Sequence, residues 1–323
     1  MGNCVCRKKT ENKISGAPSV AVVGSTGYVG KILMPAFLEG LKDGKLKEVR
    51  VLTTEAKLNS QQIQDYASSG AKAFAIDYAN VSTVTAALKG VDAVVSTLGP
   101  GGEGIENVKT TLIDALVAAK VKLYFPSEFG TNHYKYTNYS HPLFDGKRMH
   151  FKQAKERGLN PIRMLTGCIM EFAFGKQRFG IDCISGVWTV VGNGADIPCA
   201  TTAERDLGRF TLEAVLLALS DITKCPDAIE VYSDLKTLRE YAKALDRVSE
   251  RETKIVQAQL DDFKAQYEAT QDFPKLIMIM LAEGAFDFSK STGNQLLNPN
   301  DSVWQLKRFE EFAKETGGIP GNS

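Results

Sequence analysis

A short apolar segment that runs directly into three spaced glycines is the feature of this sequence that most limits its fold. Residues 19–23 read SVAVV and are followed by GSTGYVG at residues 24–30. In a strand–turn–helix unit, the first glycine permits the tight turn, the second lets backbone approach a pyrophosphate, and the third lets the helix pack on the strand. The helix N-terminus also attracts negative charge. The segment therefore predicts a dinucleotide-binding turn, with a glycine-rich packing turn as the alternative.

Strand-like and helix-like segments alternate through the first half of the chain. The strand candidates are residues 19–23, 48–53, 73–76, 92–98 and 121–125. Between them, residues 81–88 and 108–119 carry apolar residues at three- and four-residue spacing, as in helices that pack on a sheet. This alternation predicts an α/β fold with a doubly wound parallel sheet, the NAD(P)-binding Rossmann fold. Pro35 lies inside the first helix and is expected to kink it or end it early.

The sequence divides into three predicted parts. Residues 1–17 read as a flexible tail, residues 18–160 as the Rossmann domain, and residues 161–323 as a smaller α/β domain that binds substrate. Residues 186–202 are a candidate to return to the Rossmann sheet. Further helices are expected at residues 203–219, 253–269 and 303–314.

Composition excludes several classes of protein. The 323 residues are 43% hydrophobic with a net charge of +1, which gives no field that would attract nucleic acid. Six scattered cysteines without a secretory leader indicate a reducing, cytoplasmic setting and no disulfide framework. The longest apolar run near the C-terminus, Leu276–Ala282, is too short to cross a bilayer. Neither a metal site nor a nucleophile–histidine triad has its required spacing.

The N-terminal sequence MGNCVCRKK has the ingredients of a lipid anchor. Myristate on Gly2 alone binds membranes weakly, but palmitate on Cys4 or Cys6 and the basic residues 7–9 would add a second signal. Against this interpretation, Cys6 occupies a position where the myristoylation pattern prefers Ser or Thr. A plain tail with incidental cysteines is the other interpretation.

Intact-mass measurement of the protein from its native cell distinguishes these two interpretations. An anchor at the cytoplasmic face of a membrane requires an added acyl mass. An unmodified Gly2 or a retained Met1 would exclude it.

Cofactor choice is expected to depend on the end of the second strand. An acidic residue there binds the ribose hydroxyls of NADH, whereas a basic residue suits the 2′-phosphate of NADPH. The chain reads Thr53, Thr54, Glu55, Ala56 and Lys57. Thr53, Thr54 and Lys57 favour a phosphate, whereas Glu55 favours NADH, so NADPH is preferred and NADH is the alternative.

Several of these segments resemble the atypical short-chain dehydrogenases that include isoflavone reductases, phenylcoumaran benzylic ether reductases and NmrA-like proteins. The resemblance covers roughly residues 18–210 and rests on the glycine turn, Asp77-Tyr78, LKGVDAVVSTLG at 88–99, FPSEFG at 125–130, and Lys147 at the start of a helix. The PSEFG block is the most distinctive of these motifs. The two departures are Thr54, where the family usually has an arginine, and residues 131–144, which differ from the plant reductase loop.

The resemblance implies a set of site residues. In the family, the PSEFG block lies beside the nicotinamide, and the lysine at the position of Lys147 resembles a general acid or base. The residues expected to bind the cofactor are Gly24, Ser25, Thr26, Gly27, Tyr28, Val29, Gly30, Thr53, Thr54, Lys57, Asp77, Tyr78, Thr97, Leu98, Gly99, Ser127, Phe129 and Lys147.

Elementary chemistry agrees with a catalytic Lys147, since a reductase needs a hydride donor and a proton donor. Burial would lower the pKa of a lysine toward neutrality, whereas a helix-surface lysine or a ribose ligand is the structural alternative. His133, Tyr134 and His141 follow PSEFG and are candidates to contact substrate, or are simply loop residues.

Two functions follow from these observations. The first is an NAD(P)H-dependent reductase of a small aromatic or carbonyl-containing metabolite. The second is an NmrA-like regulator that binds dinucleotide as a redox signal and acts on a protein partner without turnover. Fold does not distinguish them, because function belongs to the site.

Overall fold

Two compact units make up the chain. The computed structural model describes residues 16–99, 104–175 and 177–321, so the predicted lipidation sites Gly2, Cys4 and Cys6 lie outside the described residues. The first unit takes the chain up to Ser127 together with Phe151–Arg163 and Thr211–Ala228. The second takes Glu128–His150, Met164–Phe210 and the chain from Ile229 onward. The units therefore interleave in sequence, whereas the predicted domains meet once, at residue 160.

A five-stranded parallel sheet organises the first unit, as predicted. Its strand order is β3-β2-β1-β4-β5. The strands are β1 (Ser19–Val23), β2 (Glu48–Thr53), β3 (Lys72–Ala75), β4 (Ala93–Ser96) and β5 (Leu123–Phe125). Val20 pairs with Val49 on one side and with Ala93 on the other, and all three are fully buried. Strands buried on both faces read as continuous apolar runs, which is why the sequence displays them clearly.

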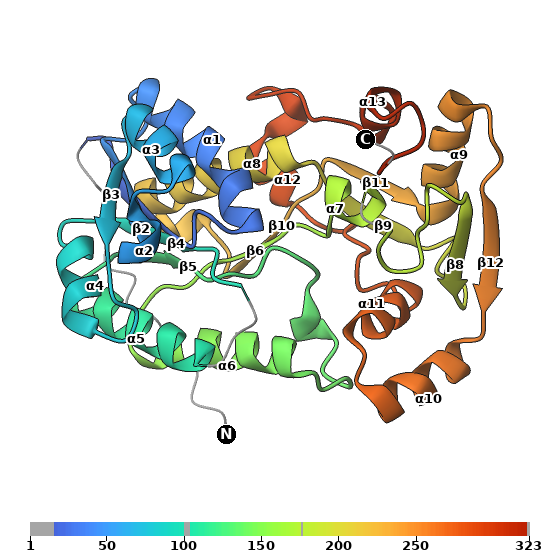
Figure 1. Cartoon of the computed structure of the whole chain (residues 1–323), viewed down its shortest axis with the longest axis horizontal. Coiled ribbons are helices and arrows are strands. Elements are labelled where there is room, and N and C mark those ends of the chain that lie inside the picture. The colour runs from blue at the N-terminus through green and yellow to red at the C-terminus, as the bar shows by residue number, and fades with distance from the viewer. Residues whose placement is uncertain (1–15, 100–103, 176, 322–323) are drawn as a thin grey trace. The chain divides into compact units, whose positions relative to one another are not determined.

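Helices cover both faces of this sheet, so the fold is doubly wound. The helices up to β5 are α1 (Tyr28–Lys42), α2 (Glu55–Leu58), α3 (Gln61–Ser68), α4 (Val81–Leu88) and α5 (Ile105–Ala118). Alternate residues of β1, Ala21 and Val23, pack in one cluster with Leu88 and Leu116 of α4 and α5. Figure 1 shows α4 and α5 on one face of the sheet and α1 on the other.

Pro35 does not end the first helix, because α1 continues to Lys42. The prediction of an early end was wrong. A proline leaves the carbonyl four residues earlier without its helical partner. Here that carbonyl belongs to Lys31, and both Pro35 and Lys31 are exposed. Water can therefore bind the carbonyl, and the loss does not break the helix.

Several small sheets form the framework of the second unit. β7 (Cys168–Ile169), β9 (Pro198–Thr202) and β11 (Asp234–Thr237) make one sheet, and β8 (Val187–Val191) pairs with β12 (Lys254–Ala258) in another. A short pair, β6 (Arg163–Leu165) with β10 (Ala228–Glu230), spans residues of both units. The expectation that residues 186–202 return to the Rossmann sheet was wrong, because β8 and β9 find partners within the second unit.

The remaining helices differ from the prediction at two places. They are α6 (Pro142–Glu156), α7 (Met170–Gly175), α8 (Glu204–Ser220), α9 (Leu238–Ser249), α10 (Leu260–Thr270), α11 (Phe273–Ala282), α12 (Gly293–Leu297) and α13 (Phe309–Glu315), with single turns η1 (His133–Lys135), η2 (Ile222–Lys224) and η3 (Pro299–Asp301). The predicted helix 253–269 is in fact β12 followed by α10, because residues 254–258 pair in register with β8. The predicted helix 303–314 begins only at Phe309.

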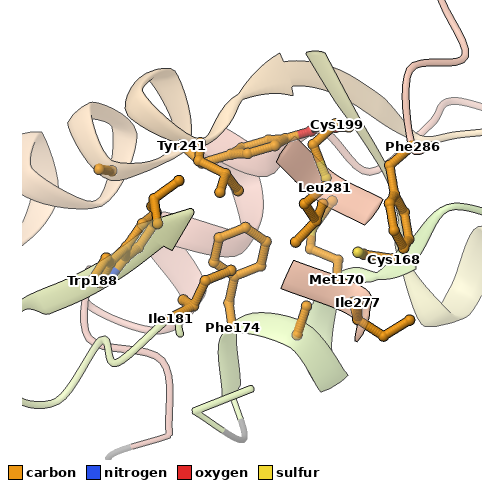
Figure 2. Packing of buried hydrophobic residues seen from close by; sticks show 14 of the residues in the cluster. Cys168, Met170, Phe174, Ile181, Trp188, Cys199, Tyr241, Ile277, Leu281 and Phe286 are labelled. Carbon is orange, nitrogen blue, oxygen red and sulfur yellow. Dashed lines mark hydrogen bonds between the residues drawn. The ribbon is translucent and has the colours of Figure 1, made fainter. Parts of the chain in front are cut away.

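An aromatic cluster lies at the centre of the second unit (Figure 2). Phe174 packs edge-on against Phe309 and Tyr241, with ring centroids 4.7 and 5.3 Å apart. Trp188 is fully buried beside them. The four cysteines within the described residues, Cys168, Cys183, Cys199 and Cys225, are buried, as small apolar residues would be. Across the described ranges, no helix combines the length and apolar character needed to cross a bilayer.

Candidate functional site

A cavity of about 210 Å³ lies within the first unit, at the carboxyl ends of its central strands. In an open α/β sheet this edge is where ligands bind. Its walls come from the glycine turn after β1, the end of β2, the segment after β3 and the segment after β4. The lining residues are Gly24, Thr26, Gly27, Leu52, Thr53, Thr54, Lys57, Tyr78, Thr97, Leu98 and Gly99. All but Leu52 were predicted from the sequence.

The glycine turn has the geometry that its sequence predicts. Gly24 has a φ of +82°, and a Cβ there would lie 3.0 Å from the backbone of Thr97. The amide of Gly27 donates to the carbonyl of Gly24 at 2.9 Å and closes the turn. A Cβ on Gly30 would lie 2.4 Å from that same carbonyl. Gly24 therefore provides the turn, and Gly30 lets α1 pack directly on it.

Ser25 supplies an independent indication that the turn accepts a ligand. Its side chain is 1% exposed, and its Oγ has no hydrogen-bond partner. Buried hydroxyls are nearly always paired, so an unpaired one in this turn indicates a missing polar partner. By contrast, the hydroxyl of Thr97 already donates to the carbonyl of Val23 at 2.9 Å. Ser25 and the turn thus fit the phosphates of a dinucleotide.

The end of β2 holds the residues predicted to select the cofactor. Thr53 is buried, whereas Glu55 and Lys57 are both exposed. Lys57 lines the cavity and Glu55 does not. Tyr78 also lines the cavity and donates to the carbonyl of Leu52 at 3.5 Å, and burial raises its pKa to about 12, so its hydroxyl stays neutral. The positive charge of Lys57 is therefore closer to a ligand in the cavity than the negative charge of Glu55.

The other predicted cofactor residues do not line this cavity. Six of them belong to the first unit: Ser25, Tyr28, Val29, Gly30, Asp77 and Ser127. Asp77 instead uses its carboxylate to accept the backbone amide of Ala79 at 2.9 Å. The two remaining predicted residues, Phe129 and Lys147, belong to the second unit. Their contacts with cofactor stay predictions.

A polar cluster in the second unit gathers Lys147 with residues of the PSEFG segment and η1. Lys147 Nζ donates to the backbone carbonyl of Glu128 at 2.7 Å. The Glu128 carboxylate lies 2.9 Å from His133 Nε2 and accepts the Tyr134 hydroxyl at 2.9 Å. The side chains of Glu128 and His133 are 1% and 2% exposed. His133 and Tyr134, predicted as substrate contacts, thus lie beside Lys147.

The electrostatics of this cluster follow from its contacts. Burial by itself would raise the pKa of Glu128, but the hydrogen bond from His133, the charge of Lys147 and the Tyr134 hydroxyl together hold it below its usual range. Burial lowers the pKa of His133. Glu128 is therefore a carboxylate and His133 is neutral, so His133 Nε2 carries the hydrogen and donates it.

His141, predicted as a substrate contact or a plain loop residue, lies at the start of α6, and its contact with substrate stays a prediction. Its Nδ1 accepts the backbone amide of Leu143 at 3.2 Å, just where α6 begins. Its ring packs at 5.0 Å from that of Phe273. These contacts cap a helix and fill the core, whereas Glu128, to which the sequence assigned no role, lies at the centre of the cluster. A glutamate three residues after an apolar strand, within the PSEFG block, is the sequence signal that could have singled it out.

We expect the carboxylate of Glu128 to stabilise the second unit in a pH-dependent way. A folded-state pKa below the usual value means that this stability is present above the ordinary carboxyl pKa of about 4.3 and is lost as the pH falls through the folded-state value. The destabilisation caused by Glu128→Gln at pH 7 should therefore shrink in acid. Free energies of unfolding measured for both proteins across this range test it, and a constant difference would contradict it.

The profile of the NmrA-like family matches residues 17–313. This chain belongs to the NmrA-like family. The family match thus continues past residue 210, where the sequence resemblance had ended, and extends through most of the second unit.

Among its relatives, the chain is 25% identical to isoflavone reductase homolog P3 of Arabidopsis thaliana over 209 residues, 61% of this chain and 64% of that protein. It is 27% identical to phenylcoumaran benzylic ether reductase TP7 of Nicotiana tabacum over 203 residues, 61% of this chain and 64% of that protein. The matched regions therefore span less than two thirds of these relatives.

Solved structures share the NmrA-like chain's fold. A binary complex of leucoanthocyanidin reductase with NADPH from Vitis vinifera aligns with a TM-score of 0.72 and 19% identity, covering 93% of this chain and 99% of that one. AtPrR2 with NADP+ and (+)pinoresinol aligns with a TM-score of 0.72 and 21% identity, covering 94% and 99%. At such identities the likeness establishes the Rossmann-type fold alone.

Proposed function

We propose that this chain is an NADPH-dependent reductase of a small aromatic or carbonyl-containing metabolite, with Lys147 as the general acid or base. The observation that carries the proposal is the placement of Lys147, whose Nζ is held at 2.7 Å by the carbonyl of Glu128, three residues after β5. The names of the relatives support it, since they include reductases of isoflavone and phenylcoumaran compounds.

NADPH would be held by the glycine turn, Ser25, Thr54 and Lys57, and would supply a hydride when bound. The chain's own contribution is to hold and move a proton. Lys147 carries that proton on Nζ, where it can be given to a substrate oxygen that gains negative charge. The proximity of Lys57 to the cavity favours the phosphate of NADPH over NADH.

Titration calorimetry with NADPH, NADH and their oxidised forms tests the proposal, followed by nicotinamide absorbance with a panel of aromatic and enone substrates. Binding of NADPH with substrate-dependent oxidation supports the reductase. Similar affinities for oxidised and reduced forms without turnover would contradict it and favour the redox sensor that acts through a protein partner.

Lys57→Ala is expected to weaken NADPH binding by about tenfold, which corresponds to about 1.4 kcal/mol, and to leave NADH binding within about twofold. The reason is that Lys57 is a cation on the wall of the cavity, and NADPH carries the additional phosphate. Calorimetry at low salt measures both affinities, since screening weakens an exposed contact. Lys89→Ala, an exposed lysine outside the cavity, is the matched control. An equal loss for both cofactors would contradict a phosphate contact.

A further inference from the structure

We propose that Glu128 is the positioning residue of Lys147. Its buried carboxylate is anchored by His133 and Tyr134, which fixes the backbone carbonyl that accepts the hydrogen bond from Lys147 Nζ. The negative charge of the carboxylate keeps Nζ protonated. This inference rests on the proposed function. It adds a residue that acts on Lys147, and it would not itself touch substrate.

Hydrogen bonds hold both the side chain and the backbone of Glu128. Its carboxylate oxygens are bound separately, Oε2 by His133 and Oε1 by Tyr134, each at 2.9 Å. Its backbone oxygen accepts Lys147 Nζ at 2.7 Å. The His133 ring is in turn stacked on Phe144, with centroids 4.5 Å apart and planes 12° apart. The carboxylate therefore cannot turn away without leaving buried donors unpaired.

The backbone beside Glu128 is held in an uncommon conformation. Phe129 has a φ of +37°, in the left-handed region that bulky side chains rarely adopt, at a cost of order 1–3 kcal/mol. The amide of Phe129 donates to the carbonyl of Met164 at 2.9 Å. The carbonyl of Gly130 accepts the amides of Thr166 and Gly167. Contacts on both sides thus support this strained turn, which aims the Glu128 carbonyl at Lys147.

The negative charge that acts on Lys147 in this cluster comes from Glu128. Its carboxylate is hydrogen-bonded by His133 and Tyr134 from η1, and the charge of Lys147, whose Nζ is bound to the Glu128 backbone carbonyl, acts on it from α6. Arg148, the other cation on this part of α6, pairs with Asp145 at 2.7 Å and donates to the His133 carbonyl. Because His133 is neutral, the carboxylate is not neutralised by it, and its negative charge acts on Lys147.

Burying a carboxylate costs free energy, so the contacts that hold the Glu128 carboxylate are informative about its role. A charge removed from water costs several kcal/mol unless it is paired and hydrogen-bonded. His133 Nδ1 is also buried with no hydrogen-bond partner, a further cost. The hydrogen bonds from His133 and Tyr134 offset this cost for Glu128, so a negative charge is held in the part of the cluster that contains Lys147.

The test compares Glu128→Gln with the unmodified full chain, using the pH dependence of Lys147 acylation by acetic anhydride, read by mass spectrometry. The glutamine keeps the size of the side chain and can accept from His133 while donating to the Tyr134 oxygen. The midpoint of Lys147 acylation should fall by about one pH unit, a tenfold change in proton affinity, since the opposing charge is gone. The basic limb of the pH profile of kcat should move in the same direction. Glu156→Gln, an exposed charge change on α6, should leave both midpoints in place.

An unchanged acylation midpoint in a folded Glu128→Gln variant would overturn the proposal. If that variant does not fold, Tyr134→Phe replaces it, because the carboxylate stays while one anchor is lost. Tyr134→Phe should lower kcat severalfold, while the acylation midpoint and the dissociation constant for NADPH stay unchanged. An unchanged kcat in this variant would equally overturn the proposal. Acylation needs no turnover, so its result is independent of whether the reductase proposal survives.

Discussion

Replacing Lys147 by methionine is expected to lower kcat by about 100- to 10,000-fold, the usual contribution of a positioned acid or base. Methionine keeps the length and apolar stem of lysine but cannot hold a proton. The dissociation constant of NADPH should stay within about twofold. For comparison, a change of about 1.4 kcal/mol in the binding free energy would change it tenfold. Steady-state kinetics and calorimetry on the same preparation measure the two quantities.

Lys152→Met is the matched control for this prediction. Lys152 lies on the same helix, and its side chain is 75% exposed. Its replacement should leave kcat and the affinity for NADPH unchanged. Turnover that survives in Lys147→Met would contradict the catalytic role of Lys147, and a parallel loss of NADPH binding would indicate a cofactor ligand instead.

Asp206→Ala is expected to destabilise the protein by about 3–5 kcal/mol, because each buried donor left without an acceptor costs about 1–3 kcal/mol. Asp206 is fully buried on α8 and accepts three hydrogen bonds. They come from the Ser233 hydroxyl at 2.7 Å, the Trp304 indole at 3.1 Å and the Lys307 amide at 2.8 Å. Alanine would leave all three donors buried without an acceptor.

Chemical unfolding followed by circular dichroism measures this loss without relying on Trp304, whose environment the mutation changes. Glu268→Ala, an exposed carboxylate on α10, should change the free energy of unfolding by less than about 0.5 kcal/mol. A loss below about 1 kcal/mol in Asp206→Ala would mean that the donors find water or other partners.

The first unit was predictable because its signals are local. Residues 19–23, 48–53 and 81–88 form β1, β2 and α4 with the predicted bounds. The central strands β1 and β4 are short, mostly apolar runs that are fully buried, as a parallel sheet covered on both faces requires. The glycine turn and the end of β2 were predicted from the same local pattern, whereas Tyr78 and residues 97–99 were predicted from the family resemblance.

The second unit was less predictable because its strands depend on distant partners. Residues 254–258 pair with residues 187–191, more than sixty positions earlier in the chain. Their apolar spacing fits a helix as well as a strand, and only the pairing decides between them. The same holds for residues 198–202, which pair with β7 and β11 within the second unit.

The sequence by itself determined the strands of the Rossmann sheet and the glycine turn, whereas the family resemblance singled out Lys147. The strands and the turn have local patterns in the chain, where spacing is sufficient information. Only the tertiary structure decided that Glu128 holds Lys147, that His133 pairs with Glu128, and that His141 caps a helix. The physical reason is that burial and hydrogen bonding depend on how separate segments pack, and a buried polar side chain is defined by partners that its own sequence neighbourhood does not specify.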